Sequence, residues 1–239
     1  MIRTVIPELL DELPPDDPRA VHSRGDLRRV NALMGNASIM AGALGATGAT
    51  GARGAGAALS IVELGGGDGT FLLELAKRVA PAIGAARATL VDQQALLTSA
   101  TRDALAALSW HVDTVKADVF EWLGRRGPEA VDLTVANLFL HHFDGERLST
   151  LLREASKQTR LFVACEPRRS PGALAAASLL RFVGCNGVTV HDARISVRAG
   201  FRDRELSALW PGGYEWALDE RHAGRFTHGF VARRGERRV

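Results

Sequence analysis

The sequence predicts an α/β fold in which helices cover both faces of a mostly parallel sheet. Two observations support this prediction. Apolar, strand-like runs alternate with amphipathic helical patterns from residue 61 to about residue 168, and this order is typical of parallel strands joined by crossover helices. The first of these runs leads into a glycine-rich turn, which is where doubly wound folds often hold a ligand.

The N-terminal part, residues 1–58, predicts a helical extension followed by a linker. Residues 26–35 carry apolar side chains on one helical face, and Gly35 stands where a capped helix would end. Residues 42–58 are rich in alanine and glycine. Because glycine disfavours a regular helix and the tract has little apolar bulk to bury, we expect a mobile linker. A helix with one face of small residues is the alternative.

The first strand of the main domain is predicted over Ile61–Leu64, and three glycines follow it in alternate positions, Gly65, Gly67 and Gly69. Glycines in such a turn can take a positive φ and let the backbone come close to a ligand. Apolar residues then recur at helical spacing from Phe71 to Pro81, where we expect the helix to end. Strand, glycine turn and helix start together indicate a cofactor-binding loop.

The glycine spacing discriminates between cofactors. A dinucleotide site needs Gly-x-Gly-x-x-Gly, but counting from Gly65 the third glycine position is Thr70. The pattern acid-x-Gly-x-Gly-x-Gly, with Glu63 as the acid, instead resembles the class I S-adenosylmethionine-dependent methyltransferases. The resemblance implies that the loop holds the amino-acid end of S-adenosyl-L-methionine. Glu63 or Asp68 would then lie close to the ammonium group of the cofactor.

Two further strand ends support the same resemblance. Residues 87–92 predict the second strand, and Asp92 at its end could accept both ribose hydroxyls, a contact that nicotinamide cofactors share. Residues 115–121 resemble the end of the third strand in the family, which implies that Asp118 meets the adenine amine and Val119 packs on the ring. The predicted cofactor-binding set also includes Gln93 and Asn137. As alternatives, the glycines form only a tight turn and the aspartates cap helices or lie in solvated loops.

The resemblance covers about residues 59–234 and implies a Rossmann-like, doubly wound sheet of seven strands. Its last two strands, predicted over residues 214–221 and 225–234, would form a hairpin with the last strand antiparallel. We therefore predict a class I methyltransferase domain over residues 59–239.

Two segments precede this hairpin. Residues 170–200 form an insertion with several apolar side chains, which predicts a helix and loop that cap the substrate pocket, or a purely structural helix. Residues 201–210 predict a helix that ends at Pro211.

Polar residues that are candidates for catalysis follow the fourth and fifth strands. Ligands of such sheets bind beyond the carboxyl ends of the strands. His141 and His142 come directly after the fourth strand, predicted over residues 131–138. A histidine, with a pKa of about 6.5, is a suitable general base for a phenol, and the resemblance supports a histidine pair or a Glu-His pair at this point. Either histidine could be the base, or could instead pack or cap the loop before Asp144.

Glu166, at the end of the fifth strand, could orient one of these histidines as the carboxylate of a catalytic triad does. It could equally pair with Arg168 or Arg169.

The predicted function is therefore S-adenosylmethionine-dependent methyl transfer to a small, aromatic or polyketide-like acceptor, at oxygen, with His141 or His142 as general base. The fourth strand ends in Ala136-Asn137-Leu138-Phe139, which departs from the motifs of nucleic-acid base methylation. The carboxylate-rich strand end of magnesium-dependent catechol enzymes is also missing, so we expect no metal. Three other functions stay open: a nicotinamide-dependent oxidoreductase, a non-catalytic cofactor-binding protein, and a protein or RNA methyltransferase.

Composition and charge narrow the possible partners and binding sites only a little. The formal net charge is +3, and only the basic residues near the C-terminus, 233–238, favour a nucleic-acid contact, so we expect no nucleic-acid partner. Cys165 and Cys185 lack the spacing of a metal site or a disulfide framework. The acidic N-terminus and the lack of a long apolar window predict a cytoplasmic protein without a membrane span. The acceptor and the oligomeric state are left open.

Overall fold

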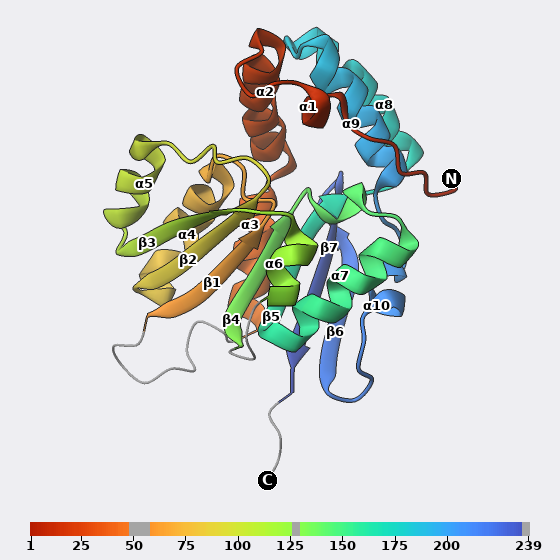
Figure 1. Cartoon of the computed structure of the whole chain (residues 1–239). Coiled ribbons are helices and arrows are strands. Elements are labelled where there is room, and N and C mark those ends of the chain that lie inside the picture. The colour runs from red at the N-terminus through yellow and green to blue at the C-terminus, as the bar shows by residue number, and fades with distance from the viewer. Residues whose placement is uncertain (48–57, 126–129, 236–239) are drawn as a thin grey trace.

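The computed structural model describes residues 1–47, 58–125 and 130–235. Its centre is a seven-stranded sheet in the order β3-β2-β1-β4-β5-β7-β6 (Figure 1). Strands β1 to β5 are parallel, β7 is antiparallel to β5, and β6 is antiparallel to β7. The predicted doubly wound sheet with an antiparallel last strand is confirmed. The strands are β1 Leu59–Leu64, β2 Ala86–Asp92, β3 Trp110–Lys116, β4 Val131–Asn137, β5 Thr159–Pro167, β6 Trp216–Ala223 and β7 Thr227–Arg234.

Helices cover both faces of this sheet. One face is covered by α3 Asn36–Ala46, α4 Thr70–Ile83 and α5 Ser99–Ala106, and the other by α6 Val119–Arg125, α7 Gly145–Gln158 and α10 Glu205–Leu209. Each face has its own apolar core: Leu72 and Leu75 of α4 belong to one, and Leu148 and Leu151 of α7 to the other. β4 is buried along its whole length, as expected for a central strand with helices on both sides.

Most of the remaining helices form a layer over the carboxyl ends of the parallel strands, which we call the cap (Figure 1). It consists of α1 Leu9–Glu12, α2 Pro18–Met34, α8 Pro171–Leu179, the short 3-10 helix η2 Leu180–Val183, and α9 Gly187–Ala199. Buried Asp26 joins α2 to α9, because its Oδ2 accepts hydrogen bonds from the Asn186 backbone N–H (2.8 Å) and the Thr189 hydroxyl (2.9 Å). The cap is thus built from two segments far apart in the sequence.

The alanine-glycine tract begins as a helix, so the expected linker is wrong for residues 42–46. These residues continue α3, whose Met40 and Leu44 are buried in the core of one sheet face. Burying two large apolar side chains contributes about 1.5–3 kcal/mol each, which exceeds the roughly 1 kcal/mol that each helical glycine costs. The rest of the tract, residues 48–57, lies outside the described residues.

Three predicted helix boundaries were also wrong. α2 begins at Pro18, after the capping residue Asp17, and not at residue 26. α4 passes through Pro81 and ends at Ile83, where Gly84 has φ +75° and its N–H donates to the Ala80 carbonyl. Pro81 stands in the last turn of the helix, and its missing N–H removes one helical hydrogen bond there. The helix predicted over residues 201–210 is shorter, because residue 201 forms a bridge with residue 168.

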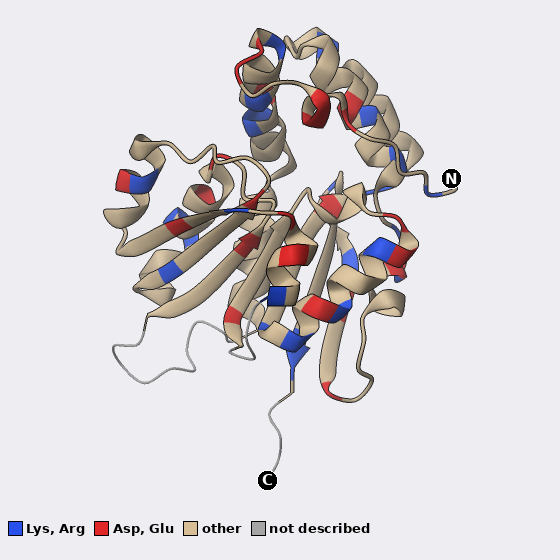
Figure 2. Ribbon diagram, viewed as in Figure 1, with Lys and Arg blue, Asp and Glu red and all other residues tan. Residues whose placement is uncertain are grey.

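Charged residues of both signs are mixed along the outer helices (Figure 2). On α4, Lys77 pairs with Glu74, and on α7, Lys157 pairs with Glu154. Such exposed pairs contribute only a few tenths of a kcal/mol each. Among the helices of residues 1–47, 58–125 and 130–235, none combines the length and apolar character that crossing a membrane requires.

Candidate active site

A cavity of about 810 Å³ lies between the carboxyl ends of the parallel strands and the cap, which is within the usual size range of small-ligand sites. The glycine loop and Asp92 line it from the sheet, His141 and His142 from the segment after β4, and α2 and α8 from the cap. The cavity therefore brings together most of the residues that the sequence predicted for cofactor and acceptor.

The glycine loop has the backbone that the sequence predicted. Gly65, Gly67 and Gly69 have φ values of +70°, +51° and +74°, a region that side chains other than glycine disfavour. A Cβ at Gly65 would lie 2.3 Å from the ring of Phe139, whereas a Cβ at Gly67 would meet nothing within 4 Å. Gly65 is thus required for packing against the segment after β4. Gly67 leaves open space on the cavity side.

Glu63, at the end of β1, is almost fully buried beside the cavity, and its Oε2 has no hydrogen-bond partner among the described residues. Burial, and then the charges of Asp68 and Asp92, raise the pKa of Glu63 well above its usual range. A buried carboxylate without a partner is costly, and a cation beside it would remove that cost. The ammonium group of S-adenosyl-L-methionine therefore fits this position.

The three predicted aspartates lie in different environments. Asp92 lines the cavity, and its two oxygens accept hydrogen bonds from the Gly67 and Gln94 backbone N–H groups (2.9 and 2.8 Å). Asp68 accepts from the Thr70 N–H and pairs with Arg28 of α2 at 3.0 Å. These contacts join the glycine loop to β2 and to the cap.

Asp118 caps α6 by accepting from the Phe120 N–H (2.8 Å), in agreement with the helix-cap alternative. Among the described residues that line the cavity, its neighbours Ala117 and Val119 are present and Asp118 is not. Gln93, also predicted for the cofactor, does line the cavity.

Asn137 belongs to a network that the sequence did not predict. Its Oδ1 accepts from the Asn36 side-chain amide (2.8 Å), and its own amide donates to Asn31 Oδ1 (3.0 Å). Asn36 Oδ1 in turn accepts from the Thr227 hydroxyl. Asn137 lines the cavity, and the network fixes the corner between α2 and α3 above β4.

The two histidines lie in a short 3-10 helix, η1 Leu140–His142, which begins after Leu138 adopts a positive φ of +52°. Glu166, fully buried at the end of β5, accepts hydrogen bonds from the backbone N–H groups of Phe139 (3.0 Å) and Leu140 (2.8 Å). His141 Nδ1 lies 2.7 Å from Glu166 Oε2. Because that oxygen belongs to a carboxylate, His141 Nδ1 is the donor. Glu166 thus holds both the turn and the imidazole.

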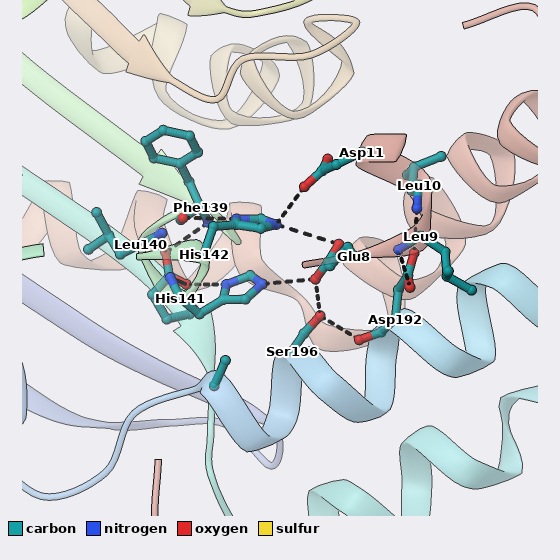
Figure 3. A network of polar contacts seen from close by, with 12 residues as sticks. Glu8, Leu9, Leu10, Asp11, Phe139, Leu140, His141, His142, Asp192 and Ser196 are labelled. Carbon is teal, nitrogen blue, oxygen red and sulfur yellow. Dashed lines mark hydrogen bonds and ion pairs between the residues drawn. The ribbon is translucent and has the colours of Figure 1, made fainter. Parts of the chain in front are cut away.

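Glu8, from the segment before α1, faces both histidines (Figure 3). Its Oε1 lies 3.3 Å from His141 Nε2, and its Oε2 lies 3.5 Å from His142 Nε2. The Ser196 hydroxyl of α9 also donates to Glu8, and Asp192 accepts from the Leu9 and Leu10 N–H groups at 2.9 and 3.0 Å. The N-terminal segment is thereby fixed to α9 with Glu8 inside the cavity.

The electrostatics of this cluster follow from burial and pairing. Burial acts to raise the pKa of Glu8, but its hydrogen bonds and charge interactions with His141 and His142 lower it well below its usual range. Burial acts to lower the pKa of His142, but the hydrogen bond and charge of Glu8, with Asp11, raise it to about 9. His142 is therefore protonated at neutral pH, and Glu8 is ionised.

The sequence left two pairings open for Glu166, and the structure separates them. Glu166 contacts His141, whereas Arg169 pairs with Glu205 of α10. Glu8 was not predicted, because one carboxylate in an acidic N-terminal segment gives no periodic or motif signal. The pairing of Glu8 with His141 joins positions 133 residues apart.

Comparisons with known proteins bear on the domain and on the fold. Residues 61–160 match the family model described as a methyltransferase domain. A comparison with curated proteins gives no match.

Several solved structures share the fold. An O-methyltransferase family protein from Burkholderia thailandensis has a TM-score of 0.57 and 16% identity over 94% of this chain, which spans 64% of that protein. The plantazolicin methyltransferase BpumL, in complex with SAH, has a TM-score of 0.60 and 12% identity, with 92% of each chain covered. Magnesium protoporphyrin IX methyltransferase from Synechocystis PCC 6803, with bound SAH, has a TM-score of 0.51 and 12% identity, with 95% of this chain and 91% of that one covered. Residues 61–160 therefore match a methyltransferase domain, and the seven-stranded fold around them is shared with these solved methyltransferase structures.

Proposed function

We propose that the protein methylates an oxygen atom of a small, aromatic or polyketide-like acceptor, with His141 as general base and Glu166 as the residue that positions it. The single observation that carries this proposal is the 2.7 Å contact between His141 Nδ1 and buried Glu166. Once the acceptor hydroxyl replaces Glu8 beside Nε2, the imidazole would be neutral and Nε2 would be the proton acceptor. His141 lines the same cavity as the glycine loop and Asp92.

The choice of His141 over His142 rests on their partners. The pKa of His142 is raised to about 9, so at neutral pH its Nε2 already carries a proton. The Nδ1–H of His142 donates to the Phe139 carbonyl (3.0 Å), and its ring is stacked on that of His141 at 4.3 Å. His142 therefore fits the role of holding Glu8, and His141 that of removing a proton.

The cap supports an apolar acceptor. The α2 residues that line the cavity include Leu27, Val30 and Met34, and α8 contributes Ala173 and Ala177. These apolar side chains would keep water away from an apolar acceptor. We propose that the cap, formed by the N-terminal helices and residues 170–200, holds the acceptor, while Glu63, Asp92 and the glycine loop hold the cofactor.

The residues then act in a defined order. Bound S-adenosyl-L-methionine supplies an electrophilic methyl group on a positively charged sulfur. The acceptor hydroxyl takes the place beside His141 Nε2 that Glu8 Oε1 holds in this structure, and its proton moves to that nitrogen. Glu166 stabilises the imidazolium that results. The acceptor oxygen, now an anion, would be the nucleophile for the methyl group that bound S-adenosyl-L-methionine supplies.

The test is turnover with a panel of phenolic acceptors, followed by mass spectrometry for the methylated product. We expect His141→Gln to lower kcat by about 10²–10⁴, the usual contribution of a general base, while S-adenosylhomocysteine binds as in the wild type. His111→Gln, at an exposed site on β3, is the matched control. Equal turnover by wild type and His141→Gln would remove His141 from the mechanism. Tight binding of NADH in place of S-adenosylhomocysteine would favour the nicotinamide alternative.

A further inference from the structure

Three potential metal ligands converge at the cap side of the cavity. One ligand atom from each of Glu8, His141 and His142 lies within 4.8 Å of the others. We propose that these three residues form a binding site for one divalent transition-metal ion of the zinc type. They come from two distant segments, which the fold brings together in the cluster drawn in Figure 3.

The separations agree with zinc geometry. Zinc bonds of about 2.0–2.2 Å to nitrogen and oxygen in a tetrahedral arrangement place neighbouring ligand atoms about 3.3–3.5 Å apart. The Glu8 oxygens lie 3.3 Å from His141 Nε2 and 3.5 Å from His142 Nε2. These distances run to Oε1 and Oε2 respectively, and one ligand atom from each residue lies within 4.8 Å of the others, so the three groups would move closer together to share one ion.

The surrounding hydrogen bonds orient both imidazoles for coordination. Metal-binding histidines usually donate their second ring N–H to a carboxylate or a backbone carbonyl. Here the Nδ1–H of His141 donates to Glu166 (2.7 Å), and the Nδ1–H of His142 donates to the Phe139 carbonyl (3.0 Å). Binding of the ion displaces the proton that His142 holds at neutral pH, and both Nε2 lone pairs would then face the Glu8 carboxylate. Three electron-pair donors around one point favour a bound cation.

The ligand types select the ion. Two imidazoles and one carboxylate suit zinc or cobalt, whereas magnesium prefers ligands that are all oxygen. Three protein ligands leave a fourth position, as in catalytic zinc sites. Asp11, whose Oδ2 lies 3.9 Å from His142 Nε2 and whose side chain is mostly exposed, or a ligand in the cavity could fill it.

The sequence predicted no metal because the end of the fourth strand lacks a carboxylate cluster. That expectation did not include Glu8, which the N-terminal segment supplies. The metal site does not rest on the proposed methylation, but both use His141 Nε2. An ion bound there occupies the lone pair that the base needs, so we expect zinc to inhibit turnover and the metal-free protein to be the active form.

The site is tested with the full chain, stripped of metal with EDTA, in the absence of cofactor and acceptor. Titration with Co²⁺ is followed by its visible absorption, and Zn²⁺ is added in competition. We expect one equivalent of Co²⁺ with the intense spectrum of four-coordinate cobalt, displaced by Zn²⁺ but not by Mg²⁺. Glu8→Gln and His142→Gln should each weaken binding at least tenfold, while His111→Gln binds as the wild type.

Two outcomes would overturn the site: less than half an equivalent of bound Co²⁺, or equal affinity in wild type and Glu8→Gln. Circular dichroism checks that each variant is folded, and Glu8→Gln removes a ligand without changing side-chain size. Because no methyl transfer is measured, a failure of the proposed general base leaves this result unaffected. A failure of metal binding likewise leaves the kinetics of His141→Gln to be interpreted separately.

Discussion

His141 donates to Glu166 over 2.7 Å at the point where β4 and β5 end side by side. Glu166 also accepts from the backbone N–H groups of the turn that carries the histidine. One buried carboxylate therefore sets both the position of η1 and the tautomer of the imidazole. Position and tautomer are the two properties that a general base needs.

The first prediction concerns this carboxylate. Glu166→Gln removes the charge that stabilises the His141 imidazolium, so we expect kcat to fall by about 10²–10⁴. We also expect the acid limb of the kcat–pH profile, where the general base becomes protonated, to move to lower pH. Glu166→Asp should recover part of the rate.

Steady-state kinetics against pH provide the measurement, with Glu154→Gln, a half-buried position on α7, as control. A purely structural role for Glu166 would leave the pKa of the profile unchanged in any variant that folds. That result would contradict the positioning role.

The second prediction concerns stability against pH. The pKa of His142 is about 9 in the folded chain and about 6.5 when unfolded, so the folded state holds the proton more tightly. Its contribution to the free energy of unfolding, at most about 3 kcal/mol, is complete below pH 6.5 and is lost as the pH rises to 9.

Urea denaturation at pH 6 and pH 9 measures this loss. We expect the difference between the two pH values to be clearly smaller in Glu8→Gln, which lacks the partner charge. Glu12→Gln, an exposed neighbour in α1, should behave as the wild type. The same pH dependence in all three proteins would show that the Glu8–His142 pair does not form.

The third prediction concerns the glycine loop. Gly65→Ala places a methyl group 2.3 Å from the Phe139 ring at a φ of +70°, so it should destabilise the protein by more than the roughly 1–2 kcal/mol of left-handed strain alone. Gly67→Ala, with open space around its Cβ, should cost only the strain.

A double-mutant cycle separates the clash from the strain. Adding Phe139→Ala to Gly65→Ala should restore part of the lost free energy of unfolding, whereas adding it to Gly67→Ala should not. Equal costs for the two alanine substitutions would mean that Phe139 does not pack on Gly65.

The fourth prediction separates cofactor binding from stability at Glu63. The raised pKa of this buried carboxyl means that the unfolded state loses the proton first, so its contribution to stability falls as the pH rises above about 4.5. Glu63→Gln should therefore make the ligand-free protein more stable than wild type at pH 8 and should weaken binding of S-adenosylhomocysteine. Thermal unfolding with and without the ligand measures both effects. A variant that is stabilised and binds unchanged would remove Glu63 from the cofactor site.

The sheet and the glycine loop could be predicted because their signals are local. Alternating apolar runs define the strands, and the positive φ values at Gly65, Gly67 and Gly69 follow from residue type. The strand-end residues Asp92, His141 and Glu166 were placed on one edge because parallel topology requires it. The same reasoning could not assign Asp118, since capping a helix and binding a ligand demand the same residue at the same position.

The rest depended on contacts distant in sequence. Glu8 reaches His141 across 133 residues, and Asn36 reaches Asn137 across 101. Neither contact leaves a pattern in the sequence. The early part of the alanine-glycine tract is helical because Met40 and Leu44 are buried in the core, a tertiary effect that overrides the local preference of glycine.

The central claim is that S-adenosyl-L-methionine binds at the edge formed by Glu63, the glycine loop and Asp92. Calorimetric titration of the wild type and Asp92→Asn with S-adenosylhomocysteine tests it most directly, with Asp113→Asn, an exposed aspartate of β3, as the matched control. We predict one saturable site in the wild type and in Asp113→Asn, with affinity at least tenfold weaker in Asp92→Asn. Absence of binding, or identical affinity in all three proteins, would contradict the account.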